Sequence, residues 1–443
     1  MAHDEPSVRS ALVALGHLNK SQKGSLQHAR QYSVAAKTPE RKPFLLNYNK
    51  AIRQLINDMA RPSFPPEQGL VICLLFACIE FLQADAAVAF THIRSGLNIF
   101  HELRQRRQLT PGSKSLQEAH GHIIPARLNS IEQILVQILT WSLASAMPYG
   151  MYLKTDFEYL KSCPKHFAGT TFASLADVRS SFSDIRNAAI LLARDLGIEV
   201  YGPEELTLFA RERQNSLLSS HRTWLEALTS LESSRTWSKD EMTTLSAIKV
   251  EYYSSFTACS CLTDWTQMTF DAHLADFQSI LVHARHVVDS LSLPNCHTQS
   301  KAIGAAAHFT FVTSFVPAMF NFAIRCRCPV TRREAVKILA SDIPREGLWD
   351  PAQYRKVAER VIEIEESEVD DRGWPTQASR LCRSTPGPEI DEFGGFQVEF
   401  QYANDWATSN KHSWSERLEL DTGHEQPLAL RLQDAKAPHP QQP

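Results

Sequence analysis

Apolar residues recur along most of this chain at steps of three and four, the spacing that gathers them on one face of an α-helix. The clearest run is Ala86, Phe90, Ile93, Leu97 and Phe100. The pattern predicts an amphipathic helix that lies against a core. The segment from Leu70 to Gln83 is its predicted antiparallel partner, with Ala84 and Asp85 at the joint of a helical hairpin.

Similar patterns continue towards the C-terminus. An apolar helix is predicted from Ile131 to Ala146, and another is marked by Phe277, Ile280, Ala284, Val287 and Leu291. Polar sequence from Arg104 to His122 and a break from Lys161 to Thr171 separate these helices. No strict repeat is present. The sequence therefore predicts an all-α array of packed helical hairpins over residues 8–368.

Two well-punctuated helices are predicted between Cys326 and Glu366. Thr331 and Glu334 have the spacing of a capping box, which predicts the start of the first helix. Asp350 followed by Pro351 predicts the N-cap and first residue of the second. The second helix should bury one stripe, made of Tyr354, Val357, Val361 and Ile364.

Beyond residue 368 proline, serine and charged residues replace the apolar period. Such composition is typical of disordered chain, so we expect residues 369–443 to be a largely disordered tail. One exception is the segment from Phe396 to Tyr402, whose apolar residues alternate strictly with polar ones. This alternation predicts a short β-strand.

Composition adds few constraints. The 443 residues carry a formal net charge of -3, whereas proteins that hold DNA phosphates usually have a basic surplus. The longest apolar run, from Leu70 to Ile79, is too short to cross a bilayer, and the N-terminus does not resemble a signal peptide. We therefore expect no membrane segment, and the cysteines suit a reducing compartment.

The sequence offers few candidates for chemistry. It contains no phosphate-binding loop, no GxSxG elbow and no HExxH helix. His120 and His122 lie in a predicted loop without further metal ligands nearby. Two C-x-C pairs, Cys259 with Cys261 and Cys326 with Cys328, could form a zinc or redox site only if the fold joined them, and core packing explains them more simply. We therefore predict no catalytic, cofactor-binding or metal-binding residue.

Charged clusters have two interpretations. Arginines gather at Arg325, Arg327, Arg332 and Arg333, and again at Arg104, Arg106 and Arg107. Each cluster could contact phosphate or act as a nuclear-import signal, but pairing with carboxylates on neighbouring helices is the commoner role. Three acidic residues are predicted to form a solvated helix face: Glu363, Glu365 and Glu366.

Several blocks of sequence resemble one known family. The segment CPVTRREAVKILASDIPREGLWD from Cys328 resembles a block of the fungal-specific transcription factor domain, the helical regulatory region that follows the Zn2Cys6 zinc cluster in fungal regulators. Further similar blocks occur in the same order: Pro43 to Leu55, Ile72 to Phe100, Phe172 to Arg179 and Met268 to Ile280. The resemblance implies gene regulation in the nucleus, for example of secondary metabolism.

The zinc cluster of that family is missing from this sequence. None of the nine cysteines forms the C-x2-C pair that opens the cluster, and the first is Cys73. The sequence is therefore either a natural paralogue without a DNA-binding module or a chain whose first exon has been lost. The resemblance implies a regulator that works through protein partners, either the transcription machinery or a DNA-binding relative. An effector pocket between helices would have two walls, Ile72 to Phe100 and His308 to Phe320, with a kink at Pro317. The alternatives are a non-catalytic helical scaffold and a cofactorless helical enzyme.

Overall fold

The computed structural model describes residues 5–21, 25–34, 41–61, 64–108, 171–200, 208–292, 309–310, 315–391, 393–404 and 413–420. Within these ranges the chain forms twelve α-helices, and a three-stranded sheet lies close to the C-terminus. The prediction of a mostly helical fold is confirmed. The predicted helix from Ile131 to Ala146, His120 and His122 lie outside the described residues.

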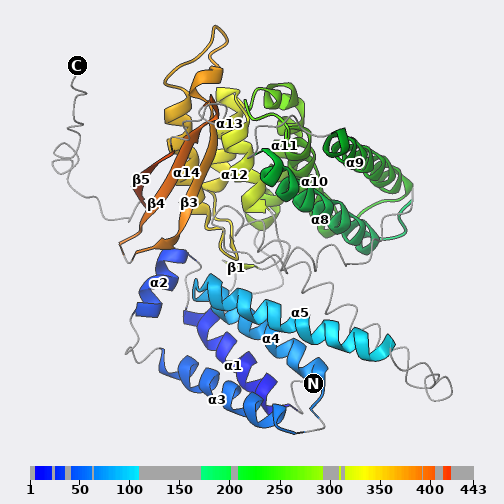
Figure 1. Cartoon of the computed structure of the whole chain (residues 1–443), viewed down its shortest axis with the longest axis vertical. Helices are drawn as coiled ribbons and strands as arrows, with labels where there is room; N and C mark the ends of the chain where they lie inside the picture. Colours follow the sequence, from blue (N-terminus) through cyan, green and yellow to red (C-terminus); the bar gives the residue numbers. More distant parts are fainter. Residues whose placement is uncertain are drawn as a thin grey trace.

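The N-terminal helices form a separate layer at one end of the molecule (Figure 1). It comprises α1 (Pro6–Ser21), α3 (Lys42–Met59), α4 (Pro66–Leu82) and α5 (Ala86–Gln108). The predicted hairpin of α4 and α5 is confirmed, and Ala84 turns the chain at its joint with a positive φ of 61°. The predicted loop from Arg104 begins too early, because α5 continues to Gln108.

A second group contains α8 (Leu175–Val200), α9 (Leu208–Ser234) and α10 (Lys239–Ser260), drawn in green in Figure 1. Its core centres on Trp224, which is fully buried and stacks on Tyr252 with ring centroids 5.5 Å apart. The Trp224 indole N–H donates to Ser181 Oγ at 2.9 Å, so the one polar atom of this ring is satisfied inside the core.

The third group follows α10 in the sequence. It contains a 3-10 turn η2 (Thr269–His273), α11 (Leu274–Ser292), α12 (Phe315–Arg325), α13 (Pro329–Leu339) and α14 (Pro351–Glu365). Short strands β1 (Phe309–Thr310) and β2 (Arg345–Glu346) pair in parallel. The predicted stripe on α14 is confirmed, since its four members are 0 to 8% exposed.

Of the two predicted helix starts, one is confirmed and the other is wrong. Asp350 caps α14 as predicted, because its Oδ1 accepts the N–H groups of Ala352 and Gln353. The capping box of Thr331 is wrong, because Pro329 starts α13 with Cys328 as N-cap. Proline is favoured at a first helical position, and Thr331 therefore falls inside the first turn.

The C-terminal sheet has the order β3 (Leu381–Ile390), β4 (Gly395–Tyr402), β5 (Ser413–Glu419), with antiparallel neighbours. The predicted strand from Phe396 to Tyr402 is confirmed as β4. The expectation of disorder is wrong for β3 and β5, which lie in the predicted tail. β3 contains Pro386 and accommodates it through an irregular register with β4. Residues 421–443 lie outside the described part.

The sheet packs against the helices rather than hanging free (Figure 1). Phe396, Val398 and Phe400 of β4 are 0 to 2% exposed and belong to one apolar core with α12 and α14. Arg360 of α14 forms a two-pronged contact with Glu416 of β5, at 2.7 and 3.0 Å. In the ranges that the structure describes, no helix is both long and apolar enough to span a bilayer.

Candidate functional site

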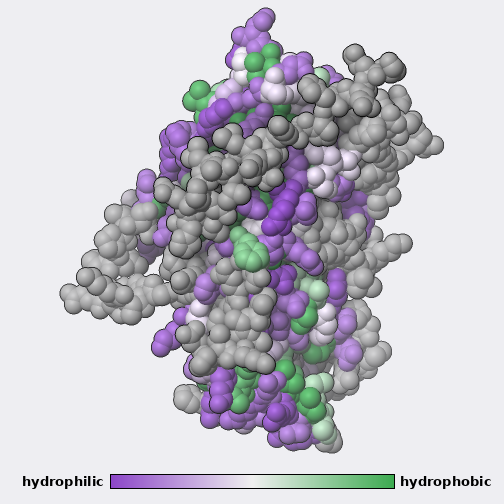
Figure 2. All heavy atoms as spheres, turned by 90° about the vertical axis from the view of Figure 1, so that its left-hand side faces the viewer, coloured by the Kyte–Doolittle hydropathy of each residue, from purple (hydrophilic) through white to green (hydrophobic). Residues whose placement is uncertain are grey.

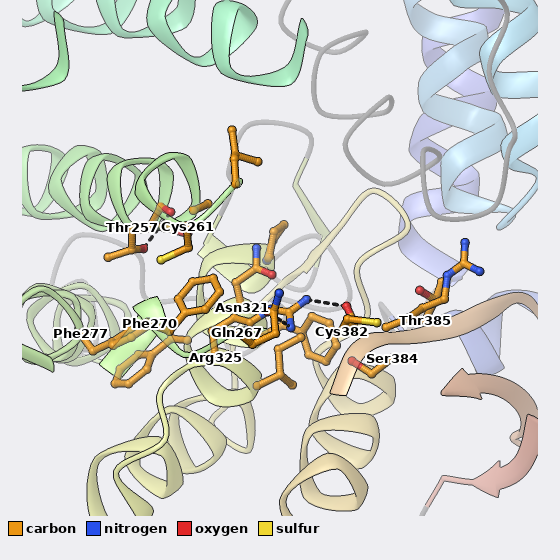
Figure 3. A pocket seen from close by; sticks show the side chains of 18 of the residues that line it. Thr257, Cys261, Gln267, Phe270, Phe277, Asn321, Arg325, Cys382, Ser384 and Thr385 are labelled. Carbon is orange, nitrogen blue, oxygen red and sulfur yellow. Dashed lines mark hydrogen bonds between the residues drawn. The ribbon is translucent and has the colours of Figure 1, made fainter. Parts of the chain in front are cut away.

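A cleft of about 550 Å³ opens where the helices meet the sheet. Its walls come from the end of α10, the loop from Cys261 to Met268, α11, α12 and the beginning of β3. Figure 3 shows Arg325 near its centre, with Cys382, Ser384 and Thr385 of β3 on one side and Phe270 and Phe277 on the other. The volume falls in the range of sites for small organic molecules.

Aromatic rings line much of this cleft and already pack on one another. Trp349 stacks on Tyr354 with ring centroids 4.2 Å apart, and Phe320 meets Tyr354 edge to face at 4.8 Å. On the other side Phe277 stacks on Phe322 at 5.3 Å. These contacts fix the orientation of the rings, so the apolar walls are preformed.

Arg325 is the central polar group of the cleft. Its Nη1 donates to Gln267 Oε1 at 2.6 Å and to Leu381 O at 2.9 Å, and its Nη2 donates to Cys382 O at 3.0 Å. Arg325 therefore connects α12, the loop after α10 and β3. Burial lowers the pKa of this guanidinium, but arginine keeps its charge at neutral pH.

Asp264 organises the loop beside Arg325. Its carboxylate accepts the N–H groups of Thr266 and Thr269, at 2.9 and 2.6 Å, so hydrogen bonds to these residues lower its pKa. Gln267 follows with a positive φ of 64°, an unusual conformation for a residue with a side chain. The hydrogen bond that Gln267 O accepts from Arg380 Nη1, at 2.8 Å, fixes this conformation.

Asp264, Gln267 and Arg380 were not predicted from the sequence as site residues. Asp264 did carry a local signal, because Asp-x-Thr is a common turn motif. Arg380 carried none. It is 1% exposed and forms a two-pronged ion pair with Asp271, at 2.8 and 2.9 Å, 109 positions earlier in the chain.

The cysteines of the two C-x-C pairs are free thiols. Cys261 lines the cleft together with Cys382, and burial raises the pKa of Cys261 to about 12. It is therefore a thiol rather than a reactive thiolate at neutral pH. Among the residues that the structure describes, no three His, Cys, Asp or Glu side chains gather in a group that could hold a metal ion.

Three members of the larger arginine cluster pair with carboxylates. Arg327 and Arg332 have fully buried side chains and both donate to Glu365 Oε2, at 3.1 and 2.8 Å. The half-exposed Arg333 pairs with Glu366. The interpretation as interhelical ion pairs is thus confirmed for these three arginines. The prediction that Glu365 lies on a solvated face is wrong, because its side chain is 0% exposed.

The predicted pocket walls are only partly correct. Pro317 and Phe320 do line the cleft, but no residue from Ile72 to Phe100 does. The predicted kink at Pro317 is wrong, because α12 begins at Phe315 and Pro317 therefore lies in the first turn. Proline is tolerated there without bending the helix.

A buried histidine, His221, lies within hydrogen-bond distance of a serine, as in the nucleophile and base pair of some hydrolases. His221 Nδ1 lies 2.9 Å from Leu217 O, which it can reach only as a donor, and Nε2 lies 3.0 Å from Ser255 Oγ. The His221 side chain is completely buried between aromatic rings, and burial lowers its pKa. This geometry joins α9 to α10 inside the core.

Comparisons of this chain with protein-family models, with curated proteins and with solved structures return no match.

Proposed function

We propose that this chain is a non-catalytic regulatory protein that binds a small-molecule effector in the cleft between α12 and β3. The observation that carries the proposal is the cleft itself, with preformed aromatic walls and an arginine at its centre. Asp264 and Arg325, which line it, already serve structural hydrogen bonds, which suits binding better than proton transfer. The resemblance to the fungal-specific transcription factor domain favours a role in gene regulation, with protein partners in the nucleus.

A ligand screen tests the effector site. A bound molecule stabilises the folded state by mass action, so an effector should raise the melting temperature in proportion to the logarithm of its concentration. The screen would use a panel of acidic, neutral and basic metabolites. Replacing exposed Asn321 on the cleft wall by tryptophan should abolish the shift, because the larger ring fills the cleft. If no compound of any charge shifts the melting temperature, the proposal fails.

A second measurement concerns DNA. Arg327 and Arg332 are fully buried and Arg325 lies in the cleft, so Arg333, 49% exposed in its side chain, is the member of the larger arginine cluster that duplex DNA could reach. We therefore expect no complex with duplex DNA in a mobility-shift titration. A complex that weakens steeply with added salt would instead identify a direct DNA-binding protein.

A scaffold is the second candidate, and one observation favours it. Figure 2 shows hydrophobic residues among hydrophilic ones at the N-terminal end of the molecule. On α3 Leu46, Ile56 and Met59 are 61 to 62% exposed. Fluorescence imaging separates the two functions, because a scaffold that stays in the cytoplasm would contradict the regulatory role.

A further inference from the structure

We infer that the cleft selects planar aromatic acids and binds them as carboxylates through Arg325. The inference names the ligand class of the proposed effector site and therefore rests on that proposal. It depends on three features of the described residues. Arg325 forms no ion pair, the walls of the cleft are aromatic, and the other charged groups that line the cleft already have hydrogen-bond or ion-pair partners.

Arg325 differs from the other arginines around it. Arg380 pairs with Asp271, Arg332 pairs with Glu365, and Arg383 pairs with Glu399. All three acceptors of Arg325 are neutral oxygens, one from an amide side chain and two from the backbone. Among the described residues Arg325 forms no ion pair, and Glu365, which binds Arg327 and Arg332, acts on it only through space.

The guanidinium retains donors for a ligand. Arginine has five N–H groups, and three of them are used by Gln267, Leu381 and Cys382. The remaining two are on Nε and Nη2. These nitrogens share one edge of the planar group, and such an edge matches the two oxygens of a carboxylate. Nε is not among the fully buried atoms that lack a partner, so it keeps some exposure, and Arg325 lines the cleft.

The rest of the cleft fits a flat apolar body. Trp349, Tyr354 and Phe320 form one ring cluster, and Phe270 lies under Arg325, whose Cζ is 5.7 Å from the ring centre. Flat aromatic molecules pack well against such rings. A carboxylate on the ring system would then reach Arg325 in a partly dehydrated site, where charge-assisted hydrogen bonds are strong.

The other charged groups that line the cleft already have partners. Asp264 is the acidic residue among the lining residues, and its oxygens already accept N–H groups of its own loop. Arg383 also lines the cleft, but its Nη1 lies 3.2 Å from Glu399 Oε1. The Asp264 carboxylate thus faces its own loop, whereas Arg325 keeps donors for a ligand, and an anion in the cleft would pair with Arg325.

A pair of matched ligands tests the inference on the full wild-type chain. Naphthalene-2-carboxylate and naphthalene-2-carboxamide have almost the same shape and differ in charge. Isothermal titration calorimetry should give at least about tenfold tighter binding for the carboxylate, the difference expected for one charge-assisted bidentate contact. This comparison requires no mutant. Equal affinities, or preference for the carboxamide, would overturn the inference.

Substitutions test whether the ligand contacts Arg325 in the cleft. Arg325→Gln should remove the preference for the carboxylate, whereas the control Arg333→Gln should keep it, because Arg333 is half-exposed and does not line the cleft. Asn321→Trp should block both ligands, which shows that they bind in the cleft. If neutral compounds shift the melting temperature but the carboxylate has no advantage, the ligand class is wrong and the effector site stands. If nothing binds, both proposals fail.

Discussion

Replacing Glu365 by glutamine should destabilise the protein strongly, because it leaves two buried arginines without a counter-charge. Glu365 Oε2 accepts from Arg327 and Arg332, and Oε1 accepts the N–H of Leu381 at 2.9 Å. Removing one partner of a buried ion pair costs roughly 3–5 kcal/mol. For a cooperative unit of ordinary size, about 1 kcal/mol lowers the melting temperature by roughly 2–4 °C, so we expect a decrease of about 6–20 °C.

The control is the neighbouring substitution Glu366→Gln. Glu366 pairs with Arg333, whose side chain is 49% exposed, and such pairs contribute about 0–1 kcal/mol. Both variants would be compared by thermal unfolding, followed by far-UV circular dichroism. Equal losses in the two variants would refute the reasoning, because they would mean that burial of Glu365 does not determine its contribution.

A third variant distinguishes charge from packing in the same cluster. Three guanidinium nitrogens there lack a partner, namely Arg327 Nε, Arg327 Nη2 and Arg332 Nη1. Replacing both arginines by methionine and Glu365 by leucine removes the buried charges together. The loss should then be smaller than for Glu365→Gln alone, since apolar replacements of buried ion pairs are often neutral or stabilising.

Three further predictions concern other parts of the fold. Asp350→Ala should cost about 1–2 kcal/mol in a denaturant titration and expose α2 (Leu26–Val34) to proteolysis, because Asp350 caps α14 and also accepts the N–H of Leu26 at 2.6 Å. His283→Gln should flatten the pH dependence of the melting temperature between pH 6.5 and 4. Burial and nearby Lys249 lower the pKa of His283 to about 4. As the pH is lowered from 6.5 to 4, the unfolded state of the wild type therefore binds the proton first, and this residue decreases the free energy of unfolding by about 1–3 kcal/mol. Gly394→Ala should lower the melting temperature of the protein measurably, since Gly394 has a φ of 88° and the added Cβ would lie 3.2 Å from a side-chain carbon of Leu420. An unchanged melting temperature would contradict the left-handed conformation of this turn.

One segment shows how contacts distant in sequence assemble this fold. Arg345 is fully buried and donates to Phe81 O and Leu82 O at the end of α4, at 3.2 and 3.3 Å. The next residue, Glu346, accepts the N–H of Val316 at the start of α12. The segment thus connects the N-terminal layer with the helix that bears the cleft, and burial raises the pKa of Glu346 well above its usual range.

The sequence by itself determined the elements whose burial is a local property. A helix presents the same face every three or four residues, so the α4 and α5 hairpin and the stripe on α14 could be predicted from apolar spacing. The same holds for β4, because its apolar residues alternate. The cap at Asp350 was also predictable, since its partners lie only two and three positions further on.

Only the tertiary structure decided the remaining features. β3 and β5 are polar or rich in proline and become strands because β4 supplies their hydrogen bonds. Glu365 resembles a surface residue in sequence, yet it is buried because two arginines more than 30 positions earlier pair with it. The cleft likewise joins residues from Ser254 to Gln401. Apolar periodicity records which face is buried but not which distant groups will meet there, because those pairings form only when the helices and the sheet pack together.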